Sequence, residues 1–313
     1  MLDNFLIAVQ AVIPLFGLIA VGLVVRKLRL LTDLELVHVN KMVFTIFFFV
    51  MLFYNVYTAK IGEMLRPYLL GFALAALAVI YLLSFGFVCL TEKDNWRRGA
   101  MIQAMYRSNF VLMGIPMAAN LCGDENIAVT TVMMTIIVPI YNVLGVVTLE
   151  IFRGGKIQPL KVIFSVFKNP MVMGAILAGV FLLLGIKIPK AFMRPLAQIT
   201  AATTPMALII LGASFKLGTI TKSLRQLVTC IVTRLLVIPG VVLFAAMQAG
   251  FRDIEFITLI AIFATPCAVA GYAMAQQMDS DADLAGNCVV FTSACSSITI
   301  FSWIFIFKTL GMF

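Results

Sequence analysis

Hydrophobic positions form long runs along the chain, and short stretches between the runs hold most of the charged residues. Runs of more than about 18 apolar residues are typical of helices that span a membrane. We therefore expect an all-α integral membrane protein with ten transmembrane helices. The predicted segments lie near residues 5–25, 36–58, 67–90, 98–121, 126–150, 170–186, 195–215, 224–248, 254–278 and 284–308.

The composition agrees with this pattern and leaves no room for a large soluble domain. Hydrophobic residues make up 62% of the 313 positions and charged residues 12%, and the mean hydropathy is +1.08. Soluble domains carry roughly twice that charged fraction. The first run has neither a basic start nor a small-residue cleavage site, so we expect it to stay as the first helix rather than to be removed as a signal peptide.

The positive charge is unevenly distributed over the loops. The net charge is +9, and thirteen of the 23 Lys and Arg residues lie in one alternating set of loops against seven in the other set. Basic loops stay on the cytoplasmic side, which predicts that both termini are outside. Basic loops beside an anionic leaflet also account for the net charge, so we expect a lipid bilayer as partner and no nucleic acid.

Chemistry that needs a metal, a cofactor or a catalytic residue is not indicated. The six cysteines form no CxxC pair, and His38 is the only histidine. Ser214 therefore lacks an evident base, and no metalloprotease motif or acidic dyad is present. We expect neither a metal nor a cofactor, and we expect that the protein is not an enzyme.

The two halves of the chain resemble each other. Residues 104–128 and 261–285 are identical at six of 25 positions with a shift of 157, and two further matches fall at shifts between 156 and 159. Each half then holds five helices. Because five is odd, the halves are inverted in the membrane, an architecture found in carriers with a site near the midplane. We predict a first repeat at 1–150, a short cytoplasmic connector at 151–169 and a second repeat at 170–313.

The fourth and ninth segments correspond in this repeat, and both carry helix-breaking residues. Gly114 and Pro116 lie in the fourth segment, and Pro266 and Gly271 lie in the ninth. A broken helix in lipid survives only where protein or a water-filled cavity satisfies its backbone groups. Two breaks facing each other would offer N–H groups and half-helix dipoles to an anion.

Polar residues near these breaks complete the predicted site. Arg107 lies ten residues beyond Arg97, or roughly 15 Å into a core about 30 Å thick, and a guanidinium there needs a partner. Arg234 lies at a similar depth and is either a second anion contact or a structural partner of backbone carbonyls. No Asp or Glu falls at mid-membrane. The predicted substrate-binding residues are Arg107, Ser108, Asn109, Gly114, Pro116, Asn142, Arg234, Thr265, Pro266 and Gly271.

The stretches "RSNFVLMGIPMAANLCG" and "ATPCAVAGYAMAQQMDSDADLAGNCVVFTSACSSITI" resemble the auxin efflux carrier family. The short segment 151–169 is similar to that of the bacterial branch, which lacks the long hydrophilic loop of plant members. The family pattern maps onto Asn109, Gly114, Pro116 and Pro266, whereas Arg107 is not part of it.

The resemblance implies a ten-helix carrier in which helices 4 and 9 cross at their breaks. Helices 1, 2, 6 and 7 would form a scaffold that joins two subunits in a homodimer, and helices 3–5 and 8–10 would form a transport domain with an elevator movement. It also implies the bacterial cytoplasmic membrane, and organic anions such as auxin, malate or malonate as substrates. A cation or proton exchanger of related fold and a ligand-sensing receptor with a carrier fold are the alternatives.

Overall fold

The computed structural model describes residues 2–58, 65–123, 127–153, 159–216, 218 and 220–313. The regular secondary structure of this part is helical, apart from an isolated bridge between Ser108 and Cys267. The α-helices are α1 (Leu2–Lys27), α2 (Asp33–Met42), α3 (Phe48–Tyr57), α4 (Pro67–Thr91), α5 (Asn95–Tyr106), α6 (Ile115–Cys122), α7 (Ala128–Phe152), α8 (Pro159–Lys168), α9 (Pro170–Leu183), α10 (Lys190–Ser214), α11 (Leu224–Val232), α12 (Ile238–Gln248), α13 (Asp253–Phe263), α14 (Val269–Gln277) and α15 (Ala282–Thr309).

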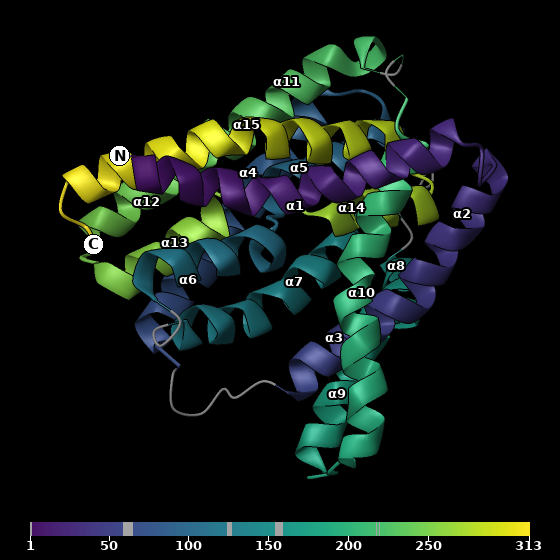
Figure 1. Ribbon diagram of the computed structural model, residues 1–313, viewed down its shortest axis with the longest axis horizontal. Helices are drawn as coiled ribbons and strands as arrows, with labels where there is room; N and C mark the ends of the chain where they lie inside the picture. The colour runs from purple at the N-terminus through teal and green to yellow at the C-terminus, as the bar shows by residue number, and fades with distance from the viewer. Residues whose placement is uncertain (1, 59–64, 124–126, 154–158, 217, 219) are drawn as a thin grey trace.

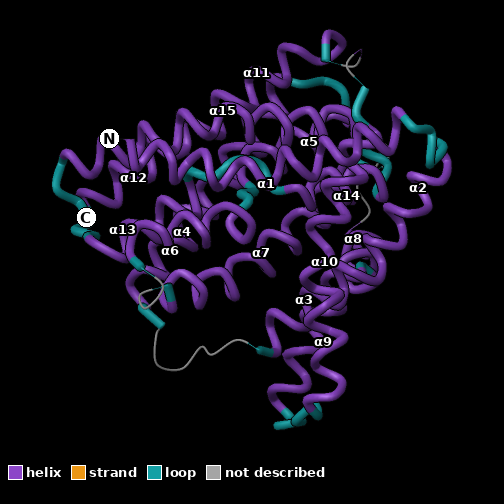
Figure 2. The backbone as a smooth tube through the Cα atoms, viewed as in Figure 1, coloured by secondary structure: helices purple, strands orange, loops and turns teal. Residues whose placement is uncertain are grey.

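Four shorter helical turns join some of these helices into longer ones. They are the π turns η1 (Val43–Phe47), η2 (Phe110–Gly114) and η6 (Thr233–Val237) and the 3-10 turn η5 (Thr221–Ser223). Through them α2 continues into α3, η2 continues into α6, and α11 continues into α12. Figure 2 shows how completely helices account for the described chain.

Six of the described helical spans are long and apolar enough to cross a membrane, or seven if the pair α8 and α9, bent by 67°, counts as one. The count of ten and the inverted repeats therefore stay predictions. The fourth and ninth predicted segments are each divided into shorter helices, so neither forms one long span. The six spans are Asp33–Tyr57, Pro67–Thr91, Ala128–Phe152, Lys190–Ser214, Thr221–Gln248 and Ala282–Thr309.

Helices α3, α9 and α10 pack together and extend away from the rest of the molecule (Figure 1). Glycines allow two very close approaches in this region. A Cβ at Gly212 would lie 2.2 Å from the carbonyl oxygen of Ile19 on α1, and one at Gly174 would lie 2.4 Å from that of Phe49 on α3. Backbones in contact without intervening side chains are typical of helix pairs in membranes, where small residues form the interface.

The remaining helices form a second, larger group around the two broken helices. Helix α13 is the most enclosed element, because every residue from Phe256 to Phe263 is at most 3% exposed. The turn before α15 is attached to the start of α5, since the N–H of Asp281 and the hydroxyl of Ser280 both donate to the carbonyl of Trp96, at 3.0 and 2.9 Å. Burial raises the pKa of Asp281, whose carboxylate accepts the N–H of Leu284 at the start of α15.

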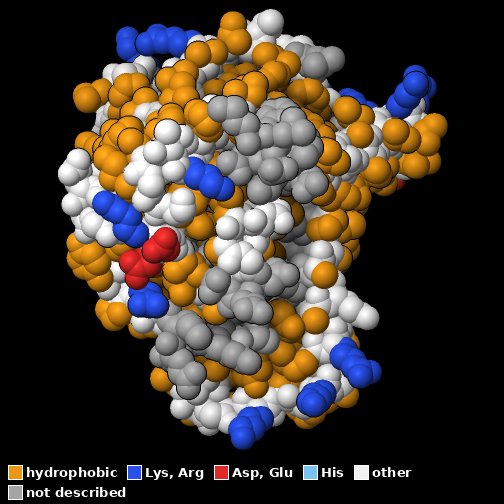
Figure 3. All heavy atoms as spheres, turned by 60° about the vertical axis from the view of Figure 1, so that its left-hand side comes forward, with side chains coloured by type: hydrophobic (Ala, Val, Ile, Leu, Met, Phe, Trp, Pro, Cys, Tyr) orange, Lys and Arg blue, Asp and Glu red, His pale blue; other side chains and the backbone are white. Residues whose placement is uncertain are grey.

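The surface agrees with a lipid environment. Large apolar side chains stand exposed on several helices, among them Leu83 and Val241, each 68% exposed. Hydrophobic side chains predominate on the face drawn in Figure 3, and charged ones are few. Apolar patches on this scale are rare on soluble monomers and mark a membrane or protein contact.

The contact between α1 and α10 should tolerate no side chain at Gly22. A Cβ there would lie 2.2 Å from the carbonyl oxygen of Ile209, whereas Gly17 on the same helix has nothing within 4 Å. Overpacking costs about 1–3 kcal/mol or more, so Gly22→Leu should lower the thermal unfolding temperature in detergent and Gly17→Leu should not. Equal unfolding temperatures for the two variants would contradict this contact.

Candidate functional site

The first broken helix divides at Arg107–Asn109, between α5 and η2. Arg107 has an extended backbone, with φ −89° and ψ 115°. The break therefore lies earlier than Gly114 and Pro116, the residues from which it was predicted. Pro116 instead follows the π turn η2, which accommodates the missing N–H of the proline within a helix.

The second broken helix divides between α13 and α14, and Pro266 lies inside this break. The two breaks meet as short extended segments. The N–H of Asn109 donates to the carbonyl of Pro266 at 2.8 Å, and the N–H of Ala268 donates to the carbonyl of Arg107 at 3.3 Å. Backbone groups that would be unpaired in a hydrocarbon environment thus pair with each other.

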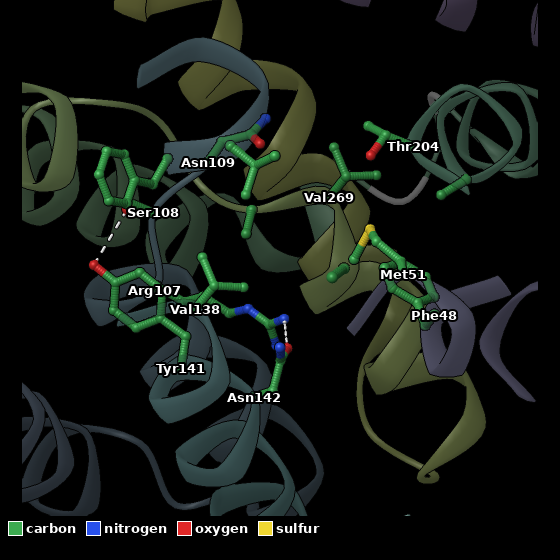
Figure 4. A pocket seen from close by; sticks show the side chains of 15 residues that line it. Phe48, Met51, Arg107, Ser108, Asn109, Val138, Tyr141, Asn142, Thr204 and Val269 are labelled. Carbon is green, nitrogen blue, oxygen red and sulfur yellow. Dashed lines mark hydrogen bonds between the residues drawn. The ribbon is translucent and has the colours of Figure 1, made fainter. Parts of the chain in front are cut away.

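We call the place where the breaks at Arg107–Asn109 and Pro266–Ala268 pair the crossing. A small cavity of about 50 Å³ lies beside it. On that scale a single water needs about 10–15 Å³, so the cavity has room for a few water molecules. The first residues of both half-helices that follow the breaks border it, namely Phe110 and Val111 of η2 and Val269 and Ala270 of α14. The positive dipole ends of two helices therefore lie at one cavity. Figure 4 shows the labelled side chains around it.

Arg107 supplies the positive charge at this cavity. Its side chain is 3% exposed, and its guanidinium donates to Asn142 Oδ1, to Gln103 Oε1 at 3.1 Å and to Met274 Sδ at 2.7 Å. All three partners are neutral. Among the residues that the structure describes, no carboxylate forms an ion pair with Arg107. The charge is therefore held in place but not compensated.

The position of the guanidinium depends on a glycine in α7. A Cβ at Gly145 would lie 2.9 Å from Gln103 Oε1 and 3.1 Å from Arg107 Nη1. Gln103 Oε1 and Arg107 Nη1 cannot move away easily, because they are hydrogen-bonded to each other. Gly145 thus creates the space that the guanidinium and its acceptor occupy.

Unpaired amide donors lie around the same cavity. Asn109 Nδ2 and Asn142 Nδ2 are buried and have no hydrogen-bond partner in the described structure. Both asparagines line the cavity, as does Ser108, whose hydroxyl donates to the hydroxyl of Tyr141 at 3.2 Å. A buried donor without a partner costs about 1–3 kcal/mol. A ligand with acceptor oxygens would remove that cost.

Of the ten predicted site residues, the structure brings four to the cavity, namely Arg107, Ser108, Asn109 and Asn142. Thr265 is fully buried, but its hydroxyl donates to the carbonyl of Ala261 at 3.0 Å. Pro266 contributes its carbonyl to the pairing of the breaks. Gly114 permits close packing instead, since a Cβ there would lie 2.8 Å from the carbonyl oxygen of Ala261. The remaining predicted residues that do not line the cavity are Pro116, Gly271 and Arg234.

Arg234 has the structural role that the sequence left open. It is fully buried in η6, and within the described residues its guanidinium donates only to backbone carbonyls. Nε reaches Thr265 at 2.9 Å, Nη1 reaches Met105 and Tyr106 at 3.2 and 3.3 Å, and Nη2 reaches Ile262 at 3.3 Å. Arg234 therefore lies at the C-terminal ends of α5 and α13, whereas the N-terminal ends of η2 and α14 border the cavity.

Sequence reasoning missed the far wall of the cavity. Phe48 and Met51 of α3 and Thr204 and Ala207 of α10 border it opposite Arg107. These residues belong to helices distant in sequence and lie in ordinary apolar runs, so no local pattern distinguishes them. Val138 and Tyr141 of α7 and Ala268 in the second break complete the lining. In the described chain, no group of three or more His, Cys, Asp and Glu side chains could hold a metal ion.

Asn142→Asp should stabilise the protein by giving Arg107 a carboxylate partner. Loss of one partner from a buried ion pair costs about 3–5 kcal/mol, so the new pair should recover part of such a penalty and raise the unfolding temperature. Asn40→Asp is the matched control. Asn40 is also fully buried, but its Nδ2 donates to the carbonyl of Ala273 at 3.4 Å, and a carboxylate there should destabilise. Destabilisation by both variants would show that the Arg107 charge is already compensated.

Comparison with known proteins identifies the family of the chain. A search of curated proteins finds no match to the chain. The family described as membrane transport protein, which comprises the auxin efflux carriers, matches residues 7–304. Because this match spans nearly all of the 313 residues, the chain belongs to the membrane transport protein family of auxin efflux carriers.

Proposed function

We propose that the protein is a carrier of small organic anions and that the cavity beside the two helix breaks is its substrate site. The observation that carries the proposal is the convergence of two half-helix N-termini and Arg107 on one cavity whose described lining contains no carboxylate. Each helix end is favourable to negative charge, and a guanidinium matches the geometry of a carboxylate. An anion is therefore the ligand that these groups require together.

The substrate classes are a dicarboxylate such as malate or malonate and an auxin-like monocarboxylate. Around Arg107, the donors Asn109 Nδ2 and Asn142 Nδ2 would hold one carboxylate group. Phe48 and Met51 form part of the opposite wall. These apolar side chains favour a substrate whose remaining part is apolar over one that carries a second carboxylate. Because the cavity holds only a few waters, it must widen when a substrate enters.

Alternating access would follow from the position of the cavity between two helix groups. One wall comes from α3 and α10, and the other comes from the two breaks, η2, α7 and α14. In the proposed elevator, the predicted scaffold, formed as a homodimer, stays fixed while the helices that carry the breaks move past it. The bacterial cytoplasmic membrane and termini on the outer side belong to the same proposal.

No observation favours the alternative functions. An exchanger of cations or protons would need a carboxylate or another acceptor at the site, whereas the described lining presents Arg107. A ligand-sensing receptor would bind the anion without moving it. Uptake into proteoliposomes separates these possibilities, since a receptor would show binding without uptake.

Arg107→Ala and Arg107→Gln should strongly weaken anion binding. A hydrogen bond to a charged group contributes about 1.5–3 kcal/mol, which corresponds to roughly a 10- to 150-fold loss of affinity. The measurement is the rise in unfolding temperature of the purified protein across a series of malate, malonate, other carboxylates and amines, followed by uptake of any anion that binds. Arg225→Ala, at an exposed position of α11, should bind as the wild type does.

Two results would contradict the proposal. One is an unchanged carboxylate response in both Arg107 variants, which would remove Arg107 from the site. The other is a wild-type response to amines alone, which would indicate a different class of carrier.

A further inference from the structure

The C-terminal ends of the two broken half-helices converge on a single buried cation. The last four carbonyls of a helix lack partners within the helix, and together they carry a partial negative charge. At the ends of α5 and α13, Arg234 contacts three of these carbonyls, Met105, Tyr106 and Ile262, and also Thr265 in the second break. In the described chain, no ion pair involves Arg234.

Donors from the two breaks satisfy four further carbonyls in the last turns of α5 and α13. All four donors lie at the two breaks, so the hydrogen bonds of α5 and α13 depend on how the breaks are positioned. The donors are the N–H of Arg107 to Gln103 at 3.0 Å, the thiol of Cys267 to Ala104 at 3.0 Å, the N–H of Ala264 to Ile260 at 2.8 Å and the hydroxyl of Thr265 to Ala261 at 3.0 Å.

The local structure of η6 directs Arg234 inward. Arg234 and Leu235 are at most 1% exposed, whereas Leu236 and Val237 are about half exposed, at 49% and 51%. The π turn adds a residue to the helix and turns this pair toward the crossing. Its own backbone is also satisfied, because Trp303 Nε1 donates to the carbonyl of Leu235 at 2.9 Å. Pro239 has no N–H that could do so.

A cluster of carbonyls at half-helix C-termini is the kind of site at which membrane carriers hold a cation such as Na⁺. Here the described structure fills that position with a side chain. The guanidinium offers five N–H donors in a fixed plane and stays charged even when buried. It can therefore bridge carbonyls from both half-helices, as a metal ion would.

We propose that Arg234 is a resident cation, whose guanidinium permanently occupies a carbonyl-lined cation site and joins the two half-helices, so that the crossing needs no bound metal ion. Arg234 is then a positioning residue, since it acts on the anion cavity through the helices it joins. The inference itself does not require the substrate to be known. Its consequence for transport, which rests on the proposed function, is uptake that does not need Na⁺.

Chemical rescue tests the proposal. Arg234→Ala removes the guanidinium and leaves the carbonyls around a space of matching shape. The unfolding temperature is measured with a thiol-reactive dye while methylguanidinium chloride is added in the millimolar range, with choline chloride at equal concentration as the salt control. We expect a marked drop in unfolding temperature for Arg234→Ala and recovery of most of that drop with methylguanidinium only. The wild type and Arg225→Ala should not respond.

Two results would overturn the inference. The first is an Arg234→Ala protein that methylguanidinium does not stabilise, because the side chain would then act only through packing. The second is an equal response of all variants, which would reflect a general effect of the additive.

A second pair of variants applies if Arg234→Ala does not fold. Arg234→Lys keeps the charge with one nitrogen, and Arg234→Met keeps the approximate volume without charge. The lysine variant should be intermediate in unfolding temperature between wild type and the methionine variant, and equal values for the two would overturn the resident cation.

Transport supplies an independent measurement. Uptake of the anion identified by the thermal screen should be equal in Na⁺ and in choline, and a strict Na⁺ requirement would contradict the inference. Since the stability experiments use no substrate, they remain decisive even if the proposed function fails.

Discussion

Every backbone N–H and C=O group within a membrane needs a partner from the protein or from a water-filled cavity, and the two broken helices of this protein are built around that constraint. Each break interrupts a helix in the buried interior and leaves unpaired groups on both sides of it. The breaks pair with each other through Asn109, Pro266, Arg107 and Ala268. The helix ends that remain are separated by the sign of their partial charge. Negative C-terminal ends lie on one side of the paired breaks, and positive N-terminal ends lie on the other.

This division links the fold to the proposed function. On one side, C-terminal carbonyls carry partial negative charge, and the guanidinium of Arg234 satisfies them. On the other side, the first turns of η2 and α14 carry partial positive charge and border a cavity together with Arg107. The protein itself supplies the cation for the C-terminal carbonyls, but its described residues supply no anion for the N-terminal ends and Arg107. In the proposed function, the anion supplies the missing charge when it binds and removes it when it leaves.

The two arginines show how surroundings determine the role of a residue type. Both are buried, and neither forms an ion pair with a described carboxylate. Arg234 directs its donors to rigid backbone carbonyls, so replacement of its partners would require the helices to separate. Arg107 directs its donors to the side chains of Asn142, Gln103 and Met274, which can rearrange around a ligand. Gly145 keeps that space open.

The sequence by itself determined the membrane class and the family, and it predicted the approximate place of the candidate site. Long apolar runs require a membrane because water cannot solvate so much apolar surface, and helix breakers among polar residues in such a run indicate a cavity. Arg107, Ser108 and Asn109 were identified in this way, since their cost in hydrocarbon is a property of each residue alone. The number of ten helices and the inversion of the halves stay predictions from the same pattern.

Only the tertiary structure decided which polar group meets which. Helix dipoles and π turns depend on where backbone hydrogen bonds begin and end, and Pro116 did not reveal that the break lies at Arg107. The roles of Arg234 and Thr265, and the contributions of Phe48, Met51 and Thr204, arise from contacts between helices far apart in the chain. Such contacts depend on how the helices cross, and a one-dimensional pattern of hydrophobic and polar residues does not encode the crossing.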